Sequence, residues 1–287
     1  MNQIDASAKI HPNVVLGDFN RIGKNVVIDI IGDNKDATAV IGDNNIINDN
    51  TRIFIRGEFR LGDWNVLHND MLVMAEDHLL IGHNCWFGQN TILDGAGGLE
   101  IGNGVRVGMY SQIWTHVASG ELIEGCTLFA KRETIIEDDV WLVGSCVVGS
   151  GIRLGYRSIA LINSILTKNT LANRVYAGSP AKIMEKANFY QPISLDEKFE
   201  MLATWIKEFV ALQEEPIDLV VELDHITIKA SNSKESVVFF KTKPKELQNS
   251  QSAFFLSDKT YIKTNTELQR KVYKYLYNNK ARFLPVL

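Results

Sequence analysis

His116 is the residue of this chain best placed to do chemistry, because it stands where a regular sequence pattern stops. The segment 117–134, which follows it, has none of the six-residue spacing found on either side. A segment of this size inside an otherwise regular fold is usually functional. An imidazole changes its protonation near neutral pH and can take a proton from an attacking hydroxyl group. The pattern therefore predicts that His116 is a general base; the alternative is an ordinary surface histidine at the edge of a loop.

Two tryptophans near this point could contact a substrate. Trp141 opens the regular stretch after the loop, and Trp114 lies two residues before His116. The flat face of an indole suits the apolar face of a sugar ring. We therefore expect both side chains to contact a saccharide. Packing against a neighbouring copy of the chain is the alternative for Trp141.

The three cysteines offer little chemistry. Cys85 and Cys146 fall at small, inward positions of the pattern, and Cys126 lies in the loop with no histidine beside it. Three widely spaced cysteines fit neither a disulfide framework nor a CxxC zinc site. We expect neither a covalent cysteine mechanism nor a metal site.

The pattern that surrounds these residues is a six-residue repeat with an aliphatic residue at each step. In the middle of the chain the step becomes 20 residues, from Ile41 to Leu61, Ile81 and Ile101, which is three hexads and a two-residue insertion. The fifth position of each hexad is small or of modest size, as at Thr51. Such alternation predicts coils of three short strands, stacked ~4.8 Å apart. Gly, Asn and Asp residues suit the corners, where positive φ is often needed.

This repeat resembles that of the hexapeptide-repeat acyltransferases over about residues 4–184. The resemblance implies a left-handed parallel β-helix and a homotrimer that uses acetyl-CoA. In saccharide O-acetyltransferases of this family, the catalytic histidine closes a coil before an acceptor loop, and a Val-Trp pair opens the next coil. His116 and Val140-Trp141 match that context. Asn90 and Asp94, one coil before His116, match positions where the family places polar contacts to the acceptor.

The same resemblance places the acyl donor along the last coils. The sequences 164–168 and 177–182 are similar to the Ser-x-Val-x-Lys and Ala-Gly-x-Pro-Ala-Lys signatures of the family. By position, the backbone would contact the pantetheine arm of coenzyme A at Gly144, Ser145 and Ala160. Basic side chains would meet its phosphates, since a flexible lysine is a suitable point charge for such groups. The candidates are Lys168, Arg174 and Lys182, each of which could instead be an ordinary surface charge.

We expect the hexads to form a first domain, residues 1–184. Residues 185–287 should form a small α+β accessory domain. A capping box that begins at Ser194 predicts an amphipathic helix of about 18 residues. A second capping box, beginning at Thr264, predicts a last helix that runs to Asn278. Three β-type stretches lie between them, at 217–228, 236–242 and 253–256.

Composition excludes several classes of protein. The chain has 287 residues, of which 45% are apolar and 22% charged, with a net charge of −4, as in ordinary folded proteins. No apolar run approaches the ~20 residues of a membrane helix, and no signal peptide is visible. No long basic run points to nucleic acid. We therefore expect a cytoplasmic protein without an integral membrane segment.

The function that the resemblance implies is transfer of an acetyl group from acetyl-CoA to a saccharide hydroxyl, with His116 as the base. The expected acceptor is a bacterial surface polymer, capsular or lipopolysaccharide. One alternative is N-acetylation of an amino-sugar nucleotide, for which the same fold and donor site would serve. Another is a zinc hydratase similar to the γ-class carbonic anhydrases, with His78, His83 and His116 as ligands. The third alternative is a non-catalytic scaffold protein.

Overall fold

The computed structural model describes residues 1–118, 120–232, 234–245 and 252–286. Residue 119 of the predicted loop, and residues 233, 246–251 and 287 of the predicted accessory domain, lie outside the described residues. The chain divides into two compact units, Met1–Tyr190 and Gln191–Leu287.

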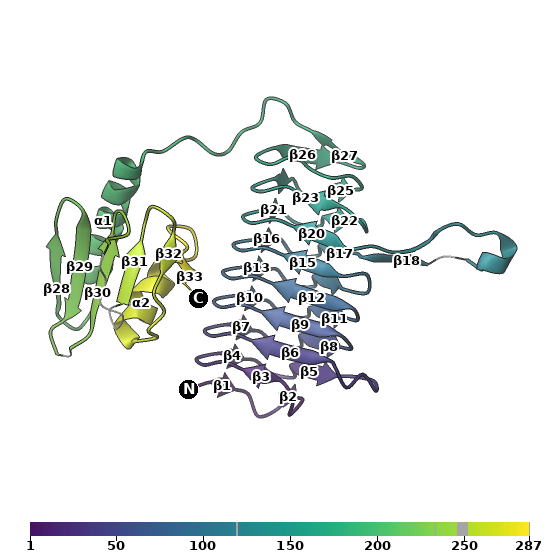
Figure 1. The fold of residues 1–287 in the computed structure, drawn as a ribbon, viewed down its shortest axis with the longest axis horizontal. Coiled ribbons are helices and arrows are strands. Elements are labelled where there is room, and N and C mark those ends of the chain that lie inside the picture. Colours follow the sequence, from purple (N-terminus) through teal and green to yellow (C-terminus); the bar gives the residue numbers. More distant parts are fainter. Residues whose placement is uncertain (119, 233, 246–251, 287) are drawn as a thin grey trace. The chain divides into compact units, whose positions relative to one another are not determined.

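The first unit is a stack of coils whose strands form the three faces of a prism, sheets A, B and C (Figure 1). Sheet A consists of β1 (Gln3–Ile4), β4 (Arg21–Ile22), β7 (Ile46–Ile47), β10 (Val66–Leu67), β13 (Trp86–Phe87), β16 (Arg106–Val107), β21 (Trp141–Leu142), β24 (Ile159–Ala160), β26 (Val175–Gly178) and β27 (Ala181–Ile183). Sheet B consists of β2 (Lys9–Ile10), β5 (Val27–Ile30), β8 (Arg52–Ile55), β11 (Leu72–Ala75), β14 (Ile92–Asp94), β17 (Gln112–Ile113), β22 (Val147–Val148) and β25 (Ile165–Leu166). Sheet C consists of β3 (Val15–Leu16), β6 (Thr38–Ile41), β9 (Glu58–Leu61), β12 (His78–Ile81), β15 (Leu99–Ile101), β20 (Thr134–Ile136) and β23 (Arg153–Leu154).

The 20-residue step of the sequence arises from longer strands in sheets B and C. Strands β8 and β9 have four residues each, and only two residues turn the corner between them. The strand register pairs Ile41 with Leu61, Leu61 with Ile81, and Ile81 with Ile101. The aliphatic residues of the repeat therefore stack up sheet C, and the predicted mainly β prism of parallel strands is confirmed.

Small polar residues at the fifth position of the hexads are buried, and their side chains accept hydrogen bonds from the backbone of the next coil. The backbone N–H of Asn65 donates to Oδ1 of Asn45, and that of Cys85 to Oδ1 of Asn65, each at 2.8 Å. Such a ladder supplies hydrogen bonds to side chains that lie wholly inside the prism. Cys85 and Cys146 are both fully buried, which confirms that they are core residues. The corners take positive φ at asparagine, as at Asn44 (59°) and Asn50 (60°).

Between β17 and β20 the chain leaves the stack at the corner of sheets B and C and forms a projecting arm (Figure 1). Its base is β18 (His116–Ala118), which pairs antiparallel with β19 (Phe129–Lys131), and the short 3-10 turn η1 (Leu122–Glu124) lies farther out. The segment predicted as a loop is thus partly a β-hairpin, and its last residue, Thr134, is already buried in β20. The arm exposes large apolar side chains at Leu122, Ile123, Leu128 and Phe129.

The second unit has one sheet and two helices among its described residues. The sheet contains, in order, β28 (Ile217–Val221), β29 (His225–Ala230), β30 (Ser236–Phe240), β31 (Ser252–Phe255), β32 (Thr260–Tyr261) and β33 (Leu284–Pro285). Helix α1 (Leu195–Ala211) begins at the predicted capping box, in which Ser194 and Glu197 cap each other. The stretch 217–228, expected as one strand, is the hairpin of β28 and β29. No helix among the described residues has the length and apolar character needed to cross a membrane.

The last helix begins later than the sequence predicts. Helix α2 (Glu267–Leu276) is capped by Thr266, whose side chain accepts from the N–H of Gln269. The side chain of Gln269 in turn accepts from the N–H groups of Thr264 and Asn265, at 2.9 and 3.0 Å. The expected cap at Thr264 is therefore wrong by two residues, because Gln269 satisfies the backbone before the helix.

Candidate active site

The candidate site lies where the arm leaves the prism. Strand β14 ends at Asp94, and β17, the next strand of sheet B, leads into Trp114, Thr115 and His116 at the same corner. Nδ1 of His116 lies 2.8 Å from Oδ2 of Asp94. The Asp94 side chain is 2% exposed and that of His116 is 38% exposed. The pair thus joins a buried carboxylate to an imidazole that solvent can reach.

Several hydrogen-bond donors offset the free-energy cost of burying the Asp94 carboxylate. Its Oδ2 accepts from the backbone N–H of Thr115 at 2.8 Å and from the Thr115 hydroxyl at 3.0 Å. Its Oδ1 accepts from the N–H of Ala96 at 3.3 Å. A carboxylate held in this way accepts the Nδ1–H of His116 and leaves the lone pair on Nε2. The arrangement fixes the ring and presents Nε2 as a proton acceptor, the geometry of an oriented general base.

This geometry corrects the role expected for Asp94. The sequence predicts a contact to the acceptor, but the side chain is buried behind His116 and its oxygens are occupied by protein donors. Trp114, by contrast, lies beside the imidazole, with its ring edge-on at a centroid separation of 6.1 Å. Its Nε1–H donates to Oε1 of Gln112 at 3.1 Å, which steadies the indole. Trp114 therefore remains a candidate contact to the acceptor.

Asn90 and Trp141 lie elsewhere in the chain. Asn90 is exposed at the corner between sheets A and B, where its φ is 57°. Asp94 lies four residues further on, at the far end of β14, and four extended residues span ~13 Å. Trp141 stands on sheet A, between the strands of Arg106 and Ile159, with 43% of the residue exposed. Within one chain the structure does not bring either residue to His116.

The residues predicted to contact the pantetheine group of coenzyme A lie along one edge of the prism. Gly144 and Ser145 turn the corner from sheet A to sheet B, where the N–H of Ser145 donates to the carbonyl of Met109 at 2.8 Å. Ala160 is 3% exposed in β24 and points into the core. Only the backbone of Ala160 could therefore meet a ligand.

The three predicted phosphate ligands are all exposed but do not share one place. Lys168 follows β25 at the corner of sheets B and C, above the corner that holds His116. Arg174 directly precedes β26, and Lys182 lies in β27, which pairs antiparallel with β26. The last two thus belong to sheet A, and the structure separates them from Lys168 by one face of the prism.

The three histidines of the predicted zinc set do not meet. His78 starts β12, whereas His83 lies beyond its other end, and Nδ1 of His83 accepts from the backbone N–H of Asp63 at 2.9 Å. Among the described residues, no cluster of metal-binding side chains contains His83 or His116. The described residues of one chain therefore contain no site of the kind that the hydratase alternative requires.

Comparison with known proteins adds a relative by sequence. No protein-family model matches the chain. Over 89 residues, which are 31% of the chain and 36% of the relative, it is 34% identical to 2,3,4,5-tetrahydropyridine-2,6-dicarboxylate N-acetyltransferase of Staphylococcus aureus strain JH9. The chain thus spans about a third of the length of the curated relatives it matches.

The solved structures that are similar to the chain include two transferases. One is a maltose O-acetyltransferase from Clostridium difficile 630, with 23% identity, a TM-score of 0.32, and coverage of 38% of this chain and 60% of that one. The other is AntD, an N-acyltransferase from Bacillus cereus in complex with dTDP and 3-hydroxybutyryl-CoA. It has 13% identity, a TM-score of 0.36, and coverage of 72% of this chain and 87% of that one.

Proposed function

The chain has the repeat and the fold of the hexapeptide-repeat acyltransferases, and from that premise we propose that it transfers an acetyl group from acetyl-CoA to a saccharide hydroxyl. The observation that carries the proposal is the 2.8 Å contact between Nδ1 of His116 and the buried carboxylate of Asp94. It orients a solvent-accessible base at the foot of an arm that can cover an acceptor.

The chemical step follows from that orientation. The acceptor oxygen attacks the thioester carbonyl carbon, and its proton passes to Nε2 of His116. The charge of Asp94 stabilises the imidazolium that forms, and the tetrahedral intermediate collapses with cleavage of the C–S bond. His116 then returns the proton to the departing thiolate, so that coenzyme A leaves as a thiol. General-base assistance of this kind is worth ~10²–10⁴ in rate.

The acceptor is proposed to lie between Trp114 and the arm. Trp114 adjoins His116, and the arm adds exposed apolar surface at Ile123 and Phe129. An open site of this kind suits a long carbohydrate, such as a capsular or lipopolysaccharide chain. In the homotrimer that we propose, the exposed Trp141 of a neighbouring subunit supplies the opposite wall.

The donor is proposed to lie along the last coils. Lys168 shares the corner of His116 two strands further up sheet B, a rise of about 10 Å at ~4.8 Å per coil. Its exposed ammonium suits a phosphate of coenzyme A. Arg174 and Lys182 belong to sheet A and would meet a phosphate only if the donor reached that face.

N-acetylation is a second candidate, and the sequence relative favours it. The 34% identical protein is an N-acetyltransferase, although the match covers only 36% of its length. An amine acceptor must also lose a proton after attack, which the same His116 could accept. An amino-sugar nucleotide is the amine acceptor that we propose for this second candidate.

Release of thiol from acetyl-CoA tests both candidates. The purified chain would be incubated with acetyl-CoA and a panel of acidic and neutral polysaccharides, sugar nucleotides and amino-sugar nucleotides. Thiol release with a hydroxyl acceptor, and a base-labile acetyl ester on the product, are the expected result. Turnover only with amines would select the second candidate. If no acceptor in the panel gave thiol release, and acetyl-CoA did not protect the chain from thermal unfolding, the proposed transferase activity would be wrong.

Replacing Trp141 with alanine tests the wall proposed for the acceptor. Loss of an aromatic contact worth about 0.5–1.5 kcal/mol should raise the KM for the acceptor about 2–10-fold. The KM for acetyl-CoA should change less than twofold. Trp86→Ala is the matched control, because Trp86 stands on the same sheet two strands lower. Equal changes in both KM values for Trp141→Ala would show that Trp141 does not contact the acceptor.

A further inference from the structure

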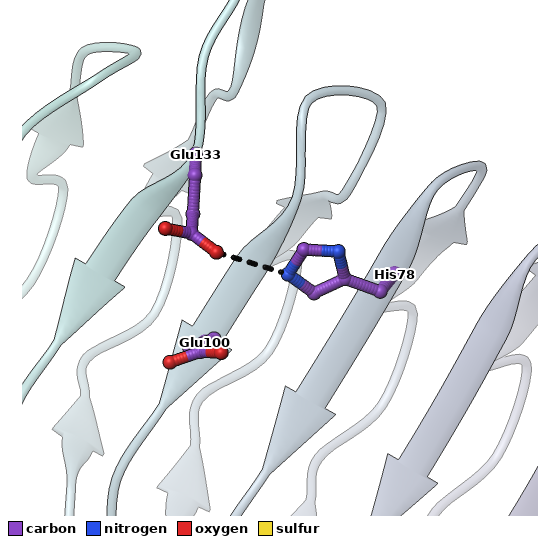
Figure 2. Close-up of side chains that lie close together, drawn as sticks. All are labelled: His78, Glu100 and Glu133. Carbon is purple, nitrogen blue, oxygen red and sulfur yellow. Dashed lines mark ion pairs between the residues drawn. The ribbon is translucent and has the colours of Figure 1, made fainter.

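We propose that His78, Glu100 and Glu133 form a binding site for a divalent transition metal, with zinc as the preferred ion (Figure 2). The three side chains come from neighbouring strands of sheet C. His78 begins β12, Glu100 lies in β15, and Glu133 directly precedes β20. One ligand atom from each lies within 4.8 Å of the other two. Nothing in the proposed acetyl transfer uses these residues.

The imidazole of His78 is held in a position that suits a metal ligand. Its Nδ1 lies 2.9 Å from Oδ2 of Asp77, so Nδ1 carries the proton and Nε2 the lone pair. A carboxylate on the far nitrogen is the usual partner of a metal-binding histidine. The close-up shows Nε2 directed toward Glu133 (Figure 2).

A glycine makes room for this ring. The strand register places Gly98 next to His78 in the coil above. A Cβ atom at position 98 would lie 2.4 Å from Cε1 and 2.9 Å from Nε2 of His78. Any other residue would therefore push the ring away from the two glutamates. The absence of a side chain at Gly98 thus leaves room for the imidazole of His78.

The arrangement needs a cation. Nε2 of His78 is enclosed and makes no hydrogen bond, although Oε1 of Glu133 is 3.4 Å away. A lone pair that faces carboxylate oxygens is repelled unless a proton or a metal ion lies between them. Tetrahedral zinc with bonds of about 2.1 Å separates its ligand atoms by about 3.4 Å, which is the distance between Nε2 of His78 and Oε1 of Glu133.

The ligands favour a transition metal over magnesium or calcium. One imidazole and two carboxylates suit zinc, whereas magnesium and calcium prefer six or more oxygen ligands. Three protein ligands would leave a fourth position for water. Glu133 lies two residues beyond Lys131, which pairs with His116 at the base of the arm. A bound ion would therefore fix the point at which the arm rejoins the prism.

Metal binding to the whole chain tests this site directly. The chain would be stripped with a chelator and titrated with Zn²⁺ by calorimetry, and with Co²⁺ by absorbance, which reports tetrahedral coordination. One ion per chain is expected. Glu133→Gln and His78→Asn should each weaken binding by at least ~10–100-fold, the cost of losing even an outer partner of a ligand. Glu222→Gln is the control, because Glu222 belongs to a separate cluster with Asp224 and the half-buried His225.

Two glycine variants distinguish loss of the metal site from general destabilisation of the fold. Gly98 and Gly32 have nearly the same φ, 90° and 88°, but a Cβ at position 32 meets no atom within 4 Å. Both alanine variants carry similar backbone strain, and only Gly98→Ala should lose zinc. The proposal is overturned if the wild-type chain takes up no zinc. It is equally overturned if zinc binding survives Glu133→Gln, because a proton shared with His78 would then explain the cluster.

Discussion

His116→Ala is expected to lower kcat for acetyl transfer by ~10²–10⁴-fold, the usual worth of a general base. The loss should fall on kcat and leave the KM for acetyl-CoA nearly unchanged, because the imidazole acts on the acceptor proton. The fold should survive, since the His116 side chain is 38% exposed at a corner and fills no part of the core. The buried Asp94 also keeps its donors from Thr115. Steady-state thiol release and thermal unfolding measure the two effects.

The control for this variant is His11→Ala. His11 lies in the first coils, and its Nδ1 accepts the backbone N–H of nearby Asn13. That variant should turn over at the wild-type rate. If His116→Ala kept the wild-type kcat, the base would have to be another residue, and the mechanism would be wrong even if the transferase activity itself remained.

Asp94→Asn is expected to cost ~10²–10⁴-fold in kcat at nearly unchanged side-chain volume. The amide removes the charge that stabilises the imidazolium. It also places an NH₂ group at one of the two oxygen positions, where the carboxylate now accepts either from Ala96 or from both His116 and Thr115. If the NH₂ group faces His116, the imidazole must move its proton to Nε2 and can no longer accept one there. The kcat loss should approach that of His116→Ala, and the double variant should be little worse than either single one.

Asp63→Asn separates this role from the general cost of changing a buried carboxylate. Asp63 is 4% exposed and accepts the backbone N–H of Asp43 at 2.8 Å, at the corner between sheets C and A. Its amide variant should unfold at a lower temperature and keep kcat. If Asp94→Asn lost stability without losing turnover, Asp94 would be a structural residue and not a partner of the base.

The sequence by itself was sufficient to predict the repeating coil of the prism. A coil repeats the same short pattern of large, small and corner residues, so the register can be read from neighbours along the chain. The stacking of Ile41, Leu61 and Ile81 in sheet C followed from spacing alone. The break after His116 was equally visible, because an interruption of a regular pattern is a local feature. These signals predicted the prism, its core cysteines and the position of the candidate base.

Only the tertiary structure decided which side chains meet. Asp94 and His116 are 22 residues apart and touch because one coil places its corner directly above the corner of the coil before. Insertions change how many residues separate two corners, so a hexad count could not tell that Asp94 faces the base while Asn90 and Trp141 stand elsewhere. His78 and Glu133 meet for the same reason, across the arm. Contacts between coils depend on this stacking, and the stacking is a property of the folded prism.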